Sequence, residues 1–135
     1  MDELTLEAKV ENLNLVMAFV DKYLESLDCP MKAQMQIDVA VEELFVNVAS
    51  YAYAPGTGEV TIRIGTEQDS GMVDITFEDG GIPYDPLAKK DPDVTLSAAE
   101  RQIGGLGIFM VKKSMDDMQY RYENGKNILT IRKQI

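Results

Sequence analysis

The spacing of apolar residues changes from alternating to helical within the first part of the chain. Residues 3–10 alternate apolar and polar side chains, which predicts a half-buried strand at a sheet edge. Its apolar face is formed by Leu4, Leu6, Ala8 and Val10. From residue 12 to about residue 27 apolar residues recur at helical spacing, and the same spacing returns over residues 31–52. Two consecutive helices are therefore expected.

The second half of the chain contains four more segments with strand character. Residues 59–67 and 72–78 are joined by a short polar turn, and residues 118–123 and 128–132 flank an Asn-Gly pair typical of a hairpin. A third helix is predicted over residues 108–115. This order predicts a single α+β domain covering residues 1–135, a two-layer α/β sandwich with a mixed sheet and three helices.

Composition removes several classes of function. The chain of 135 residues has a formal net charge of -10, which disfavours nucleic acid as a direct partner because phosphate binding needs clustered Lys and Arg. It contains no His and one Cys, which excludes His-dependent catalysis, an internal disulfide and a Cys-based structural zinc site. The N-terminus lacks a signal-peptide layout and no apolar run approaches about 18 residues, so we expect a cytoplasmic protein without a membrane segment.

The second helix carries a polar pair away from its core stripe. Glu43 and Asn47 lie one turn apart, with apolar neighbours on both sides, so the pair is expected to be partly desolvated. A divalent cation or a polarised water would be a suitable partner for these side chains. The spacing alone fits equally a boundary pair that faces solvent.

Two glycine clusters enclose a long polar segment, residues 82–103, which suggests a lid over a binding site. Asp79 precedes the first cluster, Gly80-Gly81, and it is either a turn residue or an acceptor for an exocyclic amine. The second cluster, residues 104–107, opens the third helix, where backbone N–H groups favour a phosphate. Arg101 precedes it and could reach that phosphate or pair with surface acids.

Together these segments resemble the GHKL ATPases, the superfamily of gyrase, MutL and the catalytic domains of histidine kinases. The stretch from Glu43 to Asn47 resembles their N box, residues 79–81 the G1 box, and residues 104–107 the G2 box. The small size and the sequence EELFVNV…YAY are most similar to the bacterial anti-sigma-factor serine kinases (RsbW-like). The resemblance implies a Bergerat-type, histidine-kinase-like ATPase fold with a lid at about residues 82–103.

The resemblance also implies the role of each site residue. Asn47 would ligate Mg²⁺, Glu43 would act as general base, and Arg101 would stabilise charge on the γ-phosphate. Asp79 would receive the amino group of adenine, with Gly81 beside the ring. The remaining implied ATP contacts come from the second glycine cluster: Gly104, Gly105, Leu106 and Gly107. The sequence departs from the family pattern at three positions: Tyr51 replaces a His, Pro83 a Gly, and Asn127 lies near a position usually held by Thr.

The implied function is that of an ATP-dependent protein serine kinase involved in transcription regulation. In this family the domain sequesters a sigma factor and phosphorylates an anti-anti-sigma (STAS-type) protein, and a homodimer is expected from the family and from the apolar first strand and helix. Two alternatives stay open at this point. One is a non-catalytic switch in which ATP sets the choice of protein partner, and the other is a simple ATPase.

Overall fold

The structure is a computed structural model that describes residues 1–67, 70–88 and 105–135. Its strands and α-helices are β1 (Asp2–Glu7), α1 (Leu13–Ser26), α2 (Met31–Asn47), β2 (Glu59–Thr66), β3 (Met72–Asp79), α3 (Gly105–Ser114), β4 (Asp117–Glu123) and β5 (Lys126–Gln134). Three shorter helical segments accompany them: η1 (Val10–Asn12), η2 (Val48–Ala52) and η3 (Pro86–Ala88). The predicted α+β class and the order of elements are confirmed.

The five strands form one sheet in the order β1-β2-β3-β5-β4. Each neighbouring pair in it is antiparallel, so the expectation of a mixed sheet was wrong. The reason lies in the connections. Helices α1 and α2 return the chain to β2 in the reverse direction to β1, and α3 followed by β4 does the same between β3 and β5.

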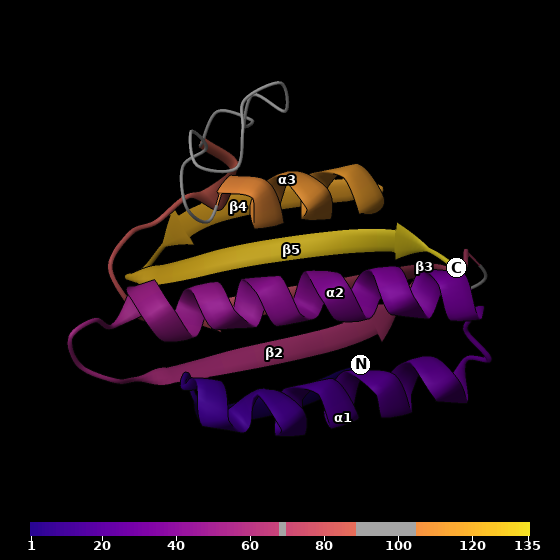
Figure 1. The fold of residues 1–135 in the computed structure, drawn as a ribbon, viewed down its shortest axis with the longest axis horizontal. Helices are drawn as coiled ribbons and strands as arrows, with labels where there is room; N and C mark the ends of the chain where they lie inside the picture. The colour runs from indigo at the N-terminus through magenta and orange to yellow at the C-terminus, as the bar shows by residue number, and fades with distance from the viewer. Residues whose placement is uncertain (68–69, 89–104) are drawn as a thin grey trace.

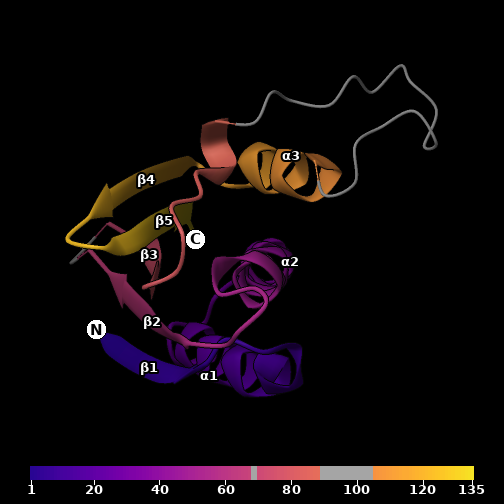
Figure 2. The same ribbon diagram turned by 90° about the vertical axis from the view of Figure 1, so that its left-hand side faces the viewer.

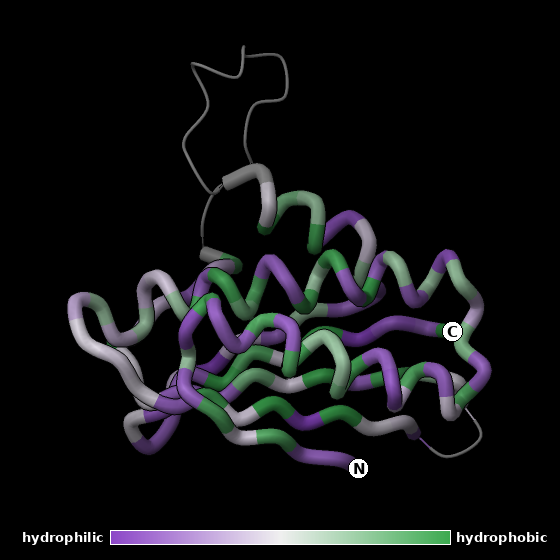
Figure 3. The backbone as a smooth tube through the Cα atoms, turned by 60° about the horizontal axis from the view of Figure 1, so that its bottom comes forward, coloured by the Kyte–Doolittle hydropathy of each residue, from purple (hydrophilic) through white to green (hydrophobic). Residues whose placement is uncertain are grey.

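The described helices all lie on one face of the sheet, and no helix of the described residues covers the other face (Figures 1 and 2). Viewed along the helices, α2 lies between α1 and α3 (Figure 2). The core forms between the two layers, where every second residue of β2 and β3 is buried. Figure 3 shows hydrophobic and hydrophilic residues alternating along the strands. The largest fully buried side chains of the core are Phe45, Phe77, Leu24, Ile37, Leu44, Ile62, Ile64, Ile75 and Ile131.

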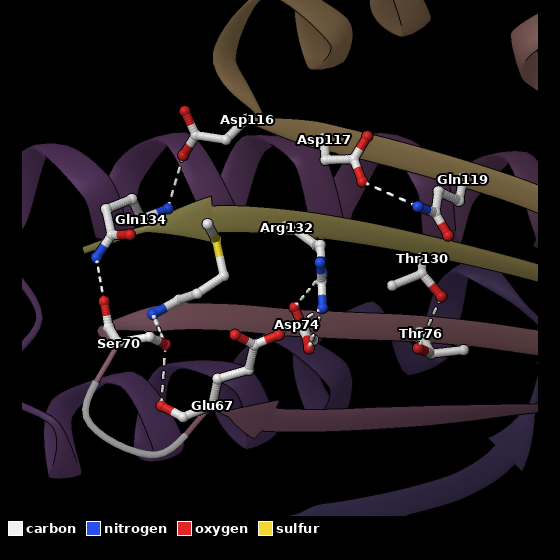
Figure 4. Close-up of polar contacts among 11 residues, drawn as sticks. Glu67, Ser70, Asp74, Thr76, Asp116, Asp117, Gln119, Thr130, Arg132 and Gln134 are labelled. Atoms are coloured by element: carbon white, nitrogen blue, oxygen red, sulfur yellow. Dashed lines mark hydrogen bonds and ion pairs between the residues drawn. The ribbon is translucent and has the colours of Figure 1, made fainter.

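The uncovered face of the sheet is held by polar cross-strand pairs (Figure 4). The hydroxyls of Thr76 and Thr130 lie 3.0 Å apart, and Arg132 contacts the carboxylates of Asp74 and Glu67 at 2.7 Å each. Such pairs let a sheet face water on one side without leaving charges unpaired.

Several element boundaries differ from the sequence prediction. Helix α3 begins at Gly105 and not at residue 108, and β5 spans Lys126–Gln134, beyond the predicted residues 128–132 at both ends. The first strand ends at Glu7, because the chain turns into η1 and leaves Val10 53% exposed instead of on the apolar face. The second helix is α-helical only to Asn47, after which Val48–Ala52 adopts π-helical geometry. The helical segment as a whole still spans the predicted residues. The hairpin at Asn124-Gly125 is confirmed, and both residues have positive φ, as a tight two-residue turn requires.

Candidate functional site

The last α-helical turn of α2 carries the polar pair singled out from the sequence. Glu43 and Asn47 are both half-buried, and the Asn47 amide nitrogen points to Glu43 Oε1 at 3.5 Å, long for a hydrogen bond. In this orientation the amide oxygen of Asn47 is directed away from the carboxylate. The π-helical turn that follows is a feature found often at functional sites. Val39, expected to flank the pair, is 59% exposed.

Asp79 closes β3 and is 5% exposed, although a carboxylate is costly to bury. Its Oδ1 atom accepts the backbone N–H of Gly81 and the side-chain amide of Asn127, both at 2.9 Å. No described residue donates a hydrogen bond to its Oδ2 atom. The turn role considered for Asp79 is thus observed through Oδ1, and the acceptor role toward an exocyclic amine stays a prediction.

Asn127 on β5 fixes this carboxylate, and it was not among the predicted site residues. Its amide nitrogen also donates to the carbonyl of Ile82 at 2.8 Å, which uses both N–H groups. Its oxygen accepts the Tyr84 backbone N–H at 3.1 Å and the Tyr120 hydroxyl at 2.5 Å. Burial raises the pKa of Tyr120, which keeps that hydroxyl a donor at neutral pH. The signal in the sequence was only that Asn127 stands near a position usually held by Thr.

Gly81 lies against the end of the helical layer. A Cβ atom at this position would be 2.2 Å from the carbonyl oxygen of Ala52, so only glycine fits. The next residue, Ile82, donates its backbone N–H to the same oxygen at 2.9 Å. The close approach seen here is to Ala52, and a place for Gly81 beside a bound base stays a prediction.

Gly107, in the first turn of α3, lies against Glu43 of α2. A Cβ atom there would be 2.0 Å from Glu43 Oε1 and 2.2 Å from its Cδ. The glycine thus leaves room for the carboxylate, and two residues 64 positions apart in the predicted N and G2 boxes are brought together.

A cavity joins the polar end of α2 to the end of β3. Asn47 and Asp79 both line it. Its other lining residues are mostly apolar or aromatic: Leu44, Val48, Ala52, Phe77, Ile82, Tyr84, Pro86, Tyr120, Asn127 and Leu129. The rings of Tyr51 and Tyr84 lie 6.2 Å apart in a tilted arrangement. A flat apolar group with one hydrogen-bond donor directed at Asp79 suits this lining.

The other predicted site residues are described partly or not at all. Gly105 begins α3 and Leu106 follows it, ahead of the predicted helix start at residue 108, and the surroundings of these two residues are not described. Arg101, Gly104 and most of the predicted lid, residues 89–103, lie outside the described residues.

The donor set suits a magnesium ion that is shared with a phosphate ligand. Among the described residues no three His, Cys, Asp or Glu side chains gather into a metal cage. Mg²⁺ prefers oxygen ligands, keeps several waters and commonly takes one or two protein ligands beside substrate phosphates. The amide oxygen of Asn47, next to Glu43, fits that pattern.

The site thus lies in a cavity between the end of a helix and the sheet of a two-layer α+β domain. The family model described as histidine kinase-like ATPase domain matches residues 6–133, and the chain belongs to this family. Its curated relatives confirm the predicted likeness to the RsbW-type members.

The relatives share low sequence identity. The serine-protein kinase RsbW of Bacillus cereus (strain G9842) is 27% identical over 95 residues, which are 67% of this chain and 58% of that protein. The chain thus matches somewhat more than half the length of the first such relatives. RsbW of Listeria monocytogenes serovar 1/2a is 26% identical over 135 residues, with 95% and 85% covered. The serine/threonine-protein kinase BtrW of Bordetella bronchiseptica is 26% identical over 100 residues, with 74% and 70% covered.

Among solved structures, the Acinetobacter baumannii histidine kinase AdeS aligns with a TM-score of 0.49 and 16% identity, over 99% of this chain and 68% of that chain. In the described part of the chain, no helix has both the length and the apolar stretch needed to cross a bilayer.

Proposed function

We propose that this domain binds Mg·ATP and transfers its γ-phosphoryl group to a serine of a protein partner. The observation that carries the proposal is the shared cavity, in which Asn47 at the end of α2 and Asp79 at the end of β3 face the same space. ATP with Mg²⁺ would supply the phosphoryl group and part of the charge neutralisation. The side chains of the protein would bind and orient the nucleotide and accept the proton of the attacking hydroxyl.

Each side chain has a task that its surroundings support. Asp79 Oδ2 accepts the hydrogen bond of an exocyclic amine, while Oδ1 is already used by Gly81 and Asn127. Asn47 offers its amide oxygen to the metal. Glu43 accepts the proton of the attacking hydroxyl as general base. Its carboxylate has room only because residue 107 is a glycine.

The second glycine cluster and Arg101 complete the proposal, and of these residues Arg101 and Gly104 lie outside the described ranges. The second glycine cluster, residues 104–107, holds the phosphates with the N-terminus of α3, and Arg101 stabilises the developing charge. These roles come from the family resemblance.

The protein partners are proposed by likeness to the RsbW and BtrW serine kinases. The substrate is an anti-anti-sigma protein of the STAS type, and the same domain sequesters a sigma factor. Homodimerisation and a cytoplasmic location are further parts of this proposal. The net charge of -10 is compatible with a basic protein partner and not with direct binding of nucleic acid.

Calorimetry tests the nucleotide site. We expect Mg·ATP to bind the wild-type domain, and Asn47→Ala to weaken binding at least tenfold in the presence of Mg²⁺ because a metal ligand is lost. Asn14→Ala removes an exposed amide from α1 and serves as the matched control. Unchanged affinity in Asn47→Ala would reject the metal-binding role.

Transfer of labelled phosphate tests the kinase. The domain is incubated with γ-labelled ATP and the anti-anti-sigma protein of its host, and Glu43→Ala is compared with Glu42→Ala, its exposed neighbour. Label on the partner that is lost only in Glu43→Ala supports the kinase. Tight ATP binding without transfer supports the non-catalytic switch, and phosphate release without any partner supports a simple ATPase.

A further inference from the structure

Tyr53 joins the end of the helical layer to two strand ends. It directly follows η2, its side chain is half-buried, and its ring packs on the hydrophobic core. Its hydroxyl accepts the backbone N–H of Gly80 at 2.7 Å and donates to the carbonyl oxygen of Glu59 at 2.5 Å. One oxygen atom therefore ties the turn after β3 to the first residue of β2.

The chain has a fitted space for the Tyr53 ring. A Cβ atom on Gly58 would be 2.3 Å from the ring, so this position must lack a side chain for the tyrosine to lie where it does. By contrast, a Cβ atom on Gly80 would be 3.7 Å from the hydroxyl, an ordinary contact. The close packing is therefore between the Tyr53 ring and Gly58, in the segment that leads into β2, and not between the hydroxyl and Gly80.

The hydroxyl keeps its proton at neutral pH. Burial raises the pKa of Tyr53, the Gly80 N–H opposes this, and the charges of Asp79 and Glu59 raise it further. A protonated hydroxyl donates to the Glu59 carbonyl and accepts from Gly80 at the same time, which a phenolate could not do.

We propose that Tyr53 is a positioning residue for purine recognition, acting through the turn that carries Asp79. The turn is attached to the helical layer at two points, by the Tyr53 hydroxyl at Gly80 and by the Ile82 N–H at the Ala52 carbonyl. Asn47 lies on the same helical segment, six residues before Tyr53. The tyrosine thereby fixes the distance between the metal-holding amide and the base-facing carboxylate. The inference rests on the proposed nucleotide-binding function.

Tyr53→Phe tests this role because it keeps the ring in its space and removes only the hydroxyl. The readout is the affinity for ATP compared with that for inosine triphosphate, whose base has an oxygen where adenine has the amine. Losing one hydrogen bond is expected to weaken ATP binding roughly three- to tenfold. Inosine triphosphate cannot donate to Asp79 through that position, so its affinity should change less than about twofold by the same reasoning. Tyr23→Phe is the matched control, since it also removes a bonded hydroxyl, 3.2 Å from Thr66 and away from the cavity.

The outcomes separate this inference from the proposed function. If the wild-type domain does not bind ATP more tightly than inosine triphosphate, the proposed adenine site is wrong, and this inference is wrong with it. A wild-type preference that Tyr53→Phe leaves unchanged, or an equal loss for both nucleotides, overturns the positioning role alone. Gly58→Ala gives a second test: it retains the tyrosine hydroxyl but displaces the ring that carries it, so it should also reduce the preference for ATP over inosine triphosphate.

Discussion

Asp38 on α2 faces Asp21 on α1, and this carboxyl pair should make folding stability depend on pH. Asp38 Oδ1 is buried with no hydrogen-bond partner in the described part of the molecule, while Asp21 Oδ1 accepts the Gln34 amide at 3.2 Å. Burial raises the pKa of Asp38 from 3.8 to about 7, and the hydrogen bond and charge of Asp21 and the charge of Glu25 add to this. The folded protein thus keeps a proton between the two helices at mildly acidic pH.

The sign of the effect follows from proton linkage. Because the folded pKa lies above the unfolded one, the folded state binds more protons between about pH 4 and pH 7. The contribution of the Asp38 proton to the free energy of unfolding is complete below about pH 4 and is lost as pH rises through about 7. A rise of three units corresponds to at most about 4 kcal/mol. Since the Asp38 side chain is only half-buried and solvent screens the pair, we expect about 1–2 kcal/mol.

Asp38→Asn removes the titrating group and keeps its shape. Urea denaturation from about pH 4 to about pH 8 should show the variant more stable than the wild type by about 1–2 kcal/mol at the upper end, with the difference vanishing at the lower end. The melting temperature at the upper end should rise by roughly 3–8 °C. Asp2→Asn, an exposed acid of β1, is the control. Parallel stability curves for the wild type and Asp38→Asn would refute the assignment of the proton to this pair.

Three substitutions at the site give contrasting outcomes. Gly81→Ala sets a Cβ against the backbone oxygen of Ala52, which cannot swing aside, so thermal melts should show a loss of about 1–3 kcal/mol together with weaker ATP binding in calorimetry. Gly107→Ala meets only the end of the Glu43 side chain, and alanine favours the helix by up to about 1 kcal/mol. Stability should hold in thermal melts while phosphate transfer drops about tenfold or more, because the added Cβ displaces the Glu43 carboxylate, and an unchanged transfer rate would contradict the role of the carboxylate. Asn127→Ala leaves several buried groups unpaired and should cost about 1–3 kcal/mol in urea denaturation as well as ATP affinity; wild-type stability would contradict the network.

The local pattern of apolar and polar residues was enough to predict most of the helices and strands. The alternation of residues 59–67 and the Asn-Gly pair at 124–125 depend on neighbours in the sequence, and both appear where they were predicted. Strand directions and the end of β1 depend on how distant elements meet. The periodicity of Val10 fitted a strand, but the chain turns there to enter α1, so tertiary context decided that residue.

The site divides in the same way. Asn47 and Asp79 could be singled out because each stands in a short motif, and the structure does place both at one cavity. The residues that hold Asp79 in place could not be predicted from the sequence, because they contact it across the sheet or between the sheet and the helices. Asn127 is 48 positions from Asp79 and reaches it only because β3 and β5 pair with these two residues opposite each other.

The pairing of Asp79 with Asn127 also gives a physical meaning to a departure from the family pattern. The sequence marks residue 127 only as an amide near a position usually held by Thr. A Thr hydroxyl has one hydrogen to donate, whereas the amide has two, and here they go to the Asp79 carboxylate and the Ile82 carbonyl. One residue thus restrains both the Asp79 carboxylate and the chain that leaves the turn. Asn127→Thr therefore separates the two tasks: a hydroxyl able to bond Asp79 should keep the preference for ATP over inosine triphosphate, while hydrogen exchange at the Ile82 and Tyr84 amides should become faster. Loss of the preference with unchanged exchange would show that the second bond contributes nothing.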